Sequence, residues 1–198
     1  MFDREFCKVQ GCPNKAVSFS EYCFSHIEDR AAYIEEFRAF FESHTKFTGL
    51  NIAYVPLDGF NIMDKSFLLA DFNHTRFHNL VSQKMVFHMC FFDYCSIESC
   101  ILAGSRHTNC IFAGSHITDT RIENASMLQN NFNNCVIKNV TFTGSDLYNS
   151  RFLFSRLENT VFYDCNLKNV DFRYSIQQNV SYKFSNHEEA IFADKVKT

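Results

Sequence analysis

A five-residue period runs through most of this chain and restricts the folds that it can adopt. Large apolar or aromatic residues recur at every fifth position from Phe47 to Tyr182, which makes 28 positions without a slip. Only Ser82, His107 and Gln177 depart from this residue type. Neither an α-helix nor a flat strand has a five-residue side-chain period. The backbone is therefore expected to turn regularly, once in each pentapeptide.

Two further positions of each pentapeptide follow the same period. The residue two places before the large one is small or compact from Cys90 to Val180, with Asn130 as the exception. Six cysteines occupy this position and are expected to act as small, buried, reduced hydrophobes: Cys90, Cys95, Cys100, Cys110, Cys135 and Cys165. The residue two places after the large one is rich in Gly, Asn and Asp, which tolerate tight-turn geometry. Each pentapeptide thus supplies two inward residues and a corner.

This pattern resembles the pentapeptide-repeat family, whose motif is A(D/N)LXX. The segments ADFNH at 70–74 and SDLYN at 145–149 match the motif, and the resemblance covers residues 47–184. It implies an all-β solenoid, a right-handed quadrilateral β-helix with four pentapeptides per coil and about seven coils. The sequence supports this coil length independently, because one column of residues spaced by twenty is entirely Phe: Phe72, Phe92, Phe112, Phe132, Phe152 and Phe172. Stacking of identical rings between coils favours such a ladder.

The register is weaker at the start of the repeats. Leu50, Phe60, Lys65 and Leu80 are large for the small inward position. Leu80 also precedes Ser82, so the two inward positions exchange roles there. We expect the first two coils to be distorted.

Both ends of a solenoid need caps, because each end exposes an apolar cross-section. Residues 27–46 are expected to form an amphipathic capping helix whose apolar face is Tyr33, Ile34, Phe37, Phe40 and Phe41. The alternative, a helix that binds a membrane surface or a partner, is disfavoured for anionic membranes by the acidic polar face. Residues 185–198 are expected to form a short C-terminal helical cap.

Aromatic residues also occupy outward positions in the last coils. A cluster of them near one end indicates an interface, and a homodimer through the C-terminal end is one form that it could take. The five candidates are Tyr148, Phe154, Tyr163, Tyr174 and Phe184.

The three remaining cysteines form the metal-like motif of the chain. Cys7, Cys12, Cys23 and His26 follow the spacing C-x4-C-x10-C-x2-H, and Gly11 suits a tight turn beside Cys12. Three thiolates and one imidazole make a closed tetrahedral zinc site, which is structural rather than catalytic. Residues 1–26 are therefore expected to form a Cys3His zinc knuckle. The alternative is three ordinary cysteines.

The sequence contains no recognisable catalytic set, so we expect an interaction scaffold and not an enzyme. His107 is expected to be a neutral, hydrogen-bonded core histidine, because it occupies a large inward position. The alternative is a point where the rod opens locally. The family resemblance implies a second hypothesis, a DNA mimic that regulates or protects a type II topoisomerase such as gyrase. Residues 60–184 hold seven Asp and three Glu against five Lys and six Arg, and this near-neutral balance disfavours mimicry.

Composition restricts the partners further. The net charge is −3, and no basic cluster indicates direct binding to nucleic acid. No apolar run has the length of a membrane span, and the N-terminal sequence does not resemble a secretory signal. We expect a cytoplasmic chain with a protein partner of unknown identity.

Overall fold

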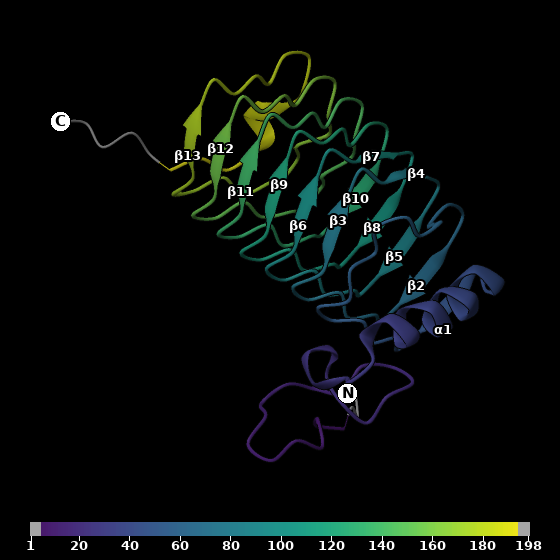
Figure 1. Ribbon diagram of the computed structural model, residues 1–198. Coiled ribbons are helices and arrows are strands. Elements are labelled where there is room, and N and C mark those ends of the chain that lie inside the picture. The colour runs from purple at the N-terminus through teal and green to yellow at the C-terminus, as the bar shows by residue number, and fades with distance from the viewer. Residues whose placement is uncertain (1–4, 194–198) are drawn as a thin grey trace.

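The computed structural model describes residues 5–193 and shows a β-solenoid rod with a small irregular segment at its N-terminal end (Figure 1). The 3-10 turn η1 (Phe24–His26) and the helix α1 (Arg30–Ser43) precede the rod. The strands are three residues each: β1 (Lys46–Thr48), β2 (Ser66–Leu68), β3 (Arg76–His78), β4 (Val81–Gln83), β5 (Val86–His88), β6 (Ser96–Glu98), β7 (Ile101–Ala103), β8 (Arg106–Thr108), β9 (His116–Thr118), β10 (Ser126–Leu128), β11 (Val136–Lys138), β12 (Arg156–Glu158) and β13 (Ile176–Gln178). A second 3-10 turn, η2 (His187–Glu189), follows them.

The strands pair in parallel between successive coils. One sheet has the order β1-β2-β5-β8-β10, a second has the order β3-β6-β9-β11-β12-β13, and β4 pairs with β7. Partners such as Phe47 and Phe67, or Phe77 and Ile97, lie twenty residues apart. Four pentapeptides therefore make one coil, and the predicted β-helix of about seven coils is confirmed.

Every fifth residue of the rod forms a corner with positive φ, which suits Gly, Asn and Asp. Along one corner the amides form a hydrogen-bonded ladder. The Asn139 amide donates to Asp119 Oδ1 at 2.8 Å, the Asn159 amide to Asn139 Oδ1 at 3.0 Å, and the Asn179 amide to Asn159 Oδ1 at 2.8 Å. The preference for Asn at these positions thus has two causes, the backbone conformation and the bonding between coils.

The interior is filled by stacked aromatic rings. The column from Phe72 to Phe172 is buried, with centroids of successive rings 4.6–5.1 Å apart and ring planes within 18° of parallel. Phe192 adds a further ring, 5.3 Å from Phe172. Two of the other columns spaced by twenty also contain stacks. One runs through Phe47, Phe67, Phe87 and His107, and the other through Phe142, Phe162 and Tyr182.

Helix α1 covers the first coil as a cap. Its N-cap Asp29 accepts a hydrogen bond from the Ala32 N–H at 2.9 Å. Tyr33, Phe37 and Phe41 are buried, and the Phe41 ring stacks on Phe47 at 5.0 Å. The helix therefore extends an aromatic column of the rod by one ring.

The first coils keep the register of the rod more closely than predicted. Leu50, Phe60, Lys65 and Leu80 all point inward and are buried. The irregularity consists of missing strand pairing at residues 56–63 and of longer hydrogen bonds between coils, such as 3.5 Å from Leu57 N to Arg76 O, 3.3 Å from Asp64 N to Gln83 O and 3.4 Å from Lys84 N to Ala103 O. Two of these large residues contact the cap: Phe60 packs against Phe37 and Phe41, and the Lys65 ammonium donates to the carbonyls of Phe41 and His44.

The short C-terminal helix is a single 3-10 turn, η2, and the chain then returns to the repeat. Ile191 forms a parallel bridge with Asp171, and Phe192 takes the next place in the Phe ladder. Residues 194–198 of the predicted cap lie outside the described residues. Within residues 5–193, no helix is long and apolar enough to cross a membrane.

Candidate metal site and outward aromatic residues

The structure brings Cys7, Cys12, Cys23 and His26 together. Their ligand atoms all lie within 4.8 Å of one another, a geometry that can hold a metal ion. Cys12 Sγ lies 3.8 Å from Cys23 Sγ, and His26 Nδ1 lies 3.3 Å from Cys7 Sγ and 3.4 Å from Cys23 Sγ. A tetrahedral zinc ion with Zn–S bonds of about 2.3 Å separates its sulfur ligands by about 3.8 Å. The four donors therefore fit one zinc ion.

Two tight turns place these ligands. The Cys12 N–H donates to Val9 O at 3.1 Å, and Gly11 within this turn has a φ of +78°. Cys23 directly precedes η1, and the His26 N–H donates to Cys23 O at 2.9 Å. Each turn thus supplies ligands from a short stretch of backbone, as expected from the C-x4-C and C-x2-H spacings.

Local hydrogen bonds favour the thiolate form of Cys7. Burial raises the pKa of Cys7, but hydrogen bonds from the Cys23 and Val9 backbone and from His26 outweigh it and lower this pKa to about 6. A backbone hydrogen bond from Asn14 lowers the pKa of Cys12, but burial and the neighbouring thiols of Cys23 and Cys7 outweigh it and raise this pKa. The amide nitrogen of Asn14 lies 4.0 Å from Cys23 Sγ and can donate to it. Such contacts stabilise the charge that a metal ligand carries.

The five outward aromatics of the last coils do not form one patch. Phe154 and Tyr174 stack at 5.1 Å on one corner of the rod. Tyr163 and Phe184 contact each other edge-to-face at 5.0 Å at a second place. Tyr148 lies two residues after Asp146, which forms a parallel bridge with Ser126 of β10. The five residues thus contact one another in two pairs, and an interface through them remains a prediction.

The corner that carries Phe154 and Tyr174 is aromatic in earlier coils as well. We call the set Tyr54, His74, Tyr94, Phe154 and Tyr174 the aromatic corner. Tyr54 stacks on His74 at 4.5 Å, and His74 on Tyr94 at 5.2 Å. The Tyr94 ring covers Gly114, the next residue of this corner. A Cβ added at Gly114 would lie 2.6 Å from the Tyr94 ring. Every twentieth residue from Tyr54 would have found this set in the sequence.

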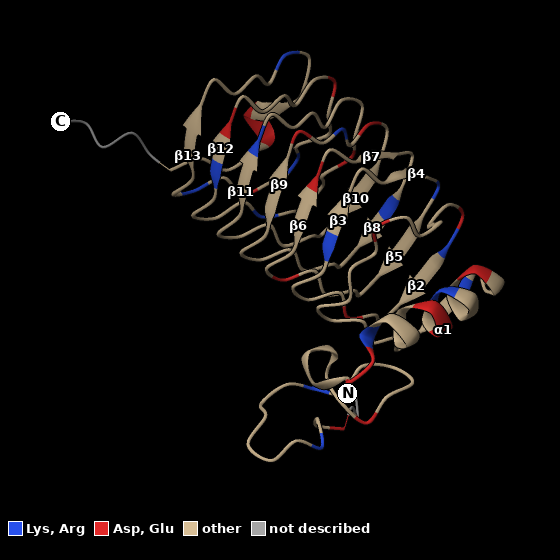
Figure 2. Cartoon of the chain, viewed as in Figure 1, with Lys and Arg blue, Asp and Glu red and all other residues tan. Residues whose placement is uncertain are grey.

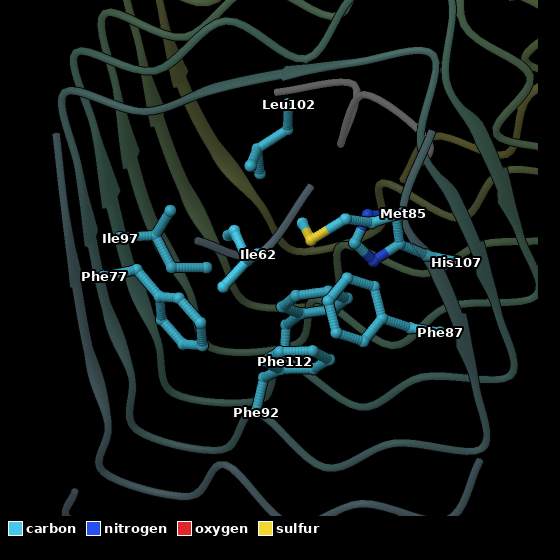
Figure 3. A pocket seen from close by; sticks show the side chains of 9 residues that line it. All are labelled: Ile62, Phe77, Met85, Phe87, Phe92, Ile97, Leu102, His107 and Phe112. Carbon is cyan, nitrogen blue, oxygen red and sulfur yellow. The ribbon is translucent and has the colours of Figure 1, made fainter. Parts of the chain in front are cut away.

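A small cavity lies inside the rod near His107 (Figure 3). It has a volume of about 20 Å³, which corresponds to roughly one water molecule. Ser105 Oγ donates to Leu102 O, so His107 Nε2 donates to Ser105 Oγ at 3.0 Å. Within the described chain, His107 Nδ1 and Ser82 Oγ are buried without a hydrogen-bond partner. Burial lowers the pKa of His107 to about 3, so the ring is neutral as predicted.

Comparisons with known proteins agree with the repeat. The family model described as "Pentapeptide repeats" matches residues 131–164 and 142–176. A search of curated proteins found no match to the chain.

Solved structures with similar coordinates include three proteins with 10–15% sequence identity. The pentapeptide repeat protein Rfr23 from the cyanobacterium Cyanothece 51142 is 15% identical with a TM-score of 0.45, and the match covers 47% of this chain and 64% of that one. HetL, involved in heterocyst differentiation regulation in Nostoc sp. strain PCC 7120, is 10% identical with a TM-score of 0.46, over 81% of this chain and 96% of that one. QnrB1, a plasmid-mediated fluoroquinolone resistance protein, is 12% identical with a TM-score of 0.42, over 75% and 83%.

Proposed function

We propose that the chain is a member of the pentapeptide-repeat family, whose model matches residues 131–164 and 142–176, and that it is a non-enzymatic protein-interaction scaffold with a structural zinc ion in its N-terminal knuckle. The aromatic corner is the observation that supports an interaction role most directly. Tyr94, Phe154 and Tyr174 are each 60–65% exposed, so these rings contribute little to the core of the rod.

The backbone conformation of the aromatic corner is unfavourable for residues other than Gly, Asn and Asp. All five residues have φ between +57° and +66°, a conformation that costs an ordinary L-residue about 1–2 kcal/mol. Asn or Gly would fit the same corner with less strain, as they do elsewhere in the rod. Aromatic residues are enriched in the cores of protein interfaces relative to the rest of the surface. We therefore assign the aromatic corner to a protein partner.

A comparison of corner variants tests this assignment. Tyr94→Asn and Phe154→Asn should keep or raise the stability of the rod, because Asn suits positive φ, and should lose partner proteins captured from the native cell. Met89→Asn is the matched control, since Met89 is an exposed apolar residue with a φ of +53° on another corner. Capture of the same partners by all variants, measured by quantitative mass spectrometry, would count against the aromatic corner.

The zinc proposal follows from the donor set and from the size of the knuckle. Thiolate and imidazole ligands favour zinc over magnesium or calcium, and four protein ligands leave no open position for a substrate. Of the residues before η1, Cys7, Val17 and Cys23 are buried. A metal ion would therefore supply much of the folding free energy of this segment.

The charge distribution does not favour the DNA-mimic hypothesis. Acidic and basic residues are interleaved along the rod (Figure 2), and some pair directly, such as Arg121 with Glu123 at 2.8 Å and Lys138 with Glu158 at 3.0 Å. A mimic of the DNA backbone needs a continuous acidic surface. The scaffold is therefore the better-supported function.

Two further parts of the proposal concern assembly and location. A second copy of the chain could bind at the C-terminal end, where Ile176 and Phe184 are about two-thirds exposed, and light scattering of the purified chain would detect such a dimer.

A cytoplasmic location is consistent with the nine free cysteines, which an oxidising compartment would tend to pair.

A further inference from the structure

The knuckle contacts the rod through one loop, and a candidate metal ligand stands at each end of this loop. The loop runs between Cys12 and Cys23. Within it, the Ser18 N–H donates to Asn51 O at 2.8 Å, and Ser18 Oγ accepts from the Asn51 N–H at 2.9 Å. The Asn51 side-chain amide also donates to Ala16 O at 2.6 Å.

The same loop packs against the cap. Val17 is buried, and Phe19 lies against Phe40 at 4.6 Å between ring centroids. The Tyr33 hydroxyl donates to Ser18 O at 3.0 Å, which joins the loop to α1. The loop thus contacts both α1 and the first coil.

Asn51 lies at the N-terminal edge of the first coil, and the loop occupies the position that a preceding coil would take there. On its other side, Asn51 pairs with Asp71 of the next coil in a parallel bridge. With the loop in place, Asn51 is only 3% exposed. Without the loop, the N–H and C=O of Asn51 would form an unpaired sheet edge, the kind of edge that accepts another extended segment.

We propose that metal binding at Cys7, Cys12, Cys23 and His26 controls whether this edge is closed, so that loss of the metal releases residues 13–22 and leaves the backbone N–H and C=O of Asn51 without their partners. This inference rests on the proposed zinc site. The physical reason is loop closure: the metal joins Cys12 to Cys23 and holds the intervening residues in one conformation. Without it, one backbone bridge, between Phe6 and Lys15, and the turn η1 remain as regular structure among described residues before α1.

Amide hydrogen exchange of the full chain tests the inference, with and without one equivalent of zinc. Removal of zinc by a chelator should raise the exchange rates of the Ser18 and Asn51 amides at least about tenfold, because local opening sets these rates. The Phe132 amide, which donates to Arg151 O at 2.7 Å in the middle of the rod, should not change. The Cys12→Ser variant should show the same pattern without a chelator.

A variant of the loop separates the two proposals. Val17→Asp should still bind one zinc per chain but should exchange rapidly at Asn51 even with zinc, since a carboxylate cannot occupy the buried Val17 site. A chain that binds zinc and protects Asn51 equally with and without the metal would overturn the coupling but not the zinc site. A chain that binds no zinc would refute the zinc site, and the coupling with it.

Discussion

Lys65 shows how a single residue can break the repeat pattern and still fit the rod. It occupies a small inward position and is only 4% exposed. Its ammonium donates to the carbonyls of Phe41 and His44, both at 2.7 Å, at the end of α1. A cation suits this place because the carbonyls at the C-terminal end of a helix carry a partial negative charge. The residue therefore ties the cap to the second coil.

The Lys65→Met variant should be less stable by about 1–3 kcal/mol in urea titration, since Met keeps the apolar stem but leaves two carbonyls without their donor. Lys84→Met is the matched control, because Lys84 is an exposed corner residue with positive φ. Equal stability of the Lys65→Met variant and the wild type would show that the ammonium does not hold the cap.

His107 predicts how stability depends on pH. Its folded pKa of about 3 lies below the ordinary value of 6.5, so the unfolded chain binds more protons between these values. Stability should therefore fall as the pH drops from about 6.5 towards 3, by at most about 1.4 kcal/mol per pH unit from this group. The His107→Phe variant should continue the stack on Phe87 and lose this contribution. Parallel slopes for variant and wild type between pH 6 and pH 4 would contradict the assignment.

At the scale of elements, the aromatic columns explain how helix and rod form one core. Phe41 of α1 stacks on Phe47, and Phe192 after η2 stacks on Phe172, so elements at both ends extend internal columns. The centroid separations near 5 Å match the spacing of neighbouring strands, which lets each coil add one ring without strain. The core therefore grows by addition of equal layers.

The centre of the ladder should be the most sensitive to truncation. Phe132 has no exposed surface and stacks at 4.8 Å on Phe112 and Phe152. Phe132→Ala should lower the free energy of unfolding by about 3–5 kcal/mol, because the rod cannot close the cavity. Phe154→Ala, which removes an exposed ring from the next coil, should cost far less. A loss below about 1 kcal/mol for Phe132→Ala in denaturant titration would exclude the ladder from the stabilising core.

The knuckle should bind one zinc ion per chain when the protein is purified without chelators. Cys12→Ser should abolish binding, because it removes a thiolate from a site with four ligands. Cys135→Ser is the control: Cys135 is a buried thiol of the rod whose pKa burial raises, so it should leave the zinc content unchanged. One zinc per chain in Cys12→Ser, measured by elemental analysis, would rule out the assignment.

At the scale of the whole molecule, the period of five predicted a regularly turning rod. The Phe column at a spacing of twenty supported the coil length that the family resemblance implied. The cluster that could hold a metal ion was also evident in the sequence, since Cys7, Cys12 and Cys23 alone among the cysteines fall outside the repeat. The contacts that join the rod, α1 and the knuckle were not predictable from the five-residue repeat. The bond from Lys65 to α1, the pairing of Ser18 with Asn51 and the ring of Phe41 on Phe47 each depend on contacts between segments that share no period.

Removal of residues 1–26 tests how far the rod depends on its knuckle. We expect the truncated chain to keep its β structure and α1, because Phe41 and Lys65 hold the helix to the rod without the knuckle. It should nevertheless aggregate, since the surface under Val17 and Phe19 and the edge at Asn51 become exposed. Circular dichroism would follow the fold, and light scattering would follow association. A truncated chain that stays monomeric and equally stable would show that the knuckle is not a cap, and the search for a partner would then start from the N-terminal segment and not from the aromatic corner.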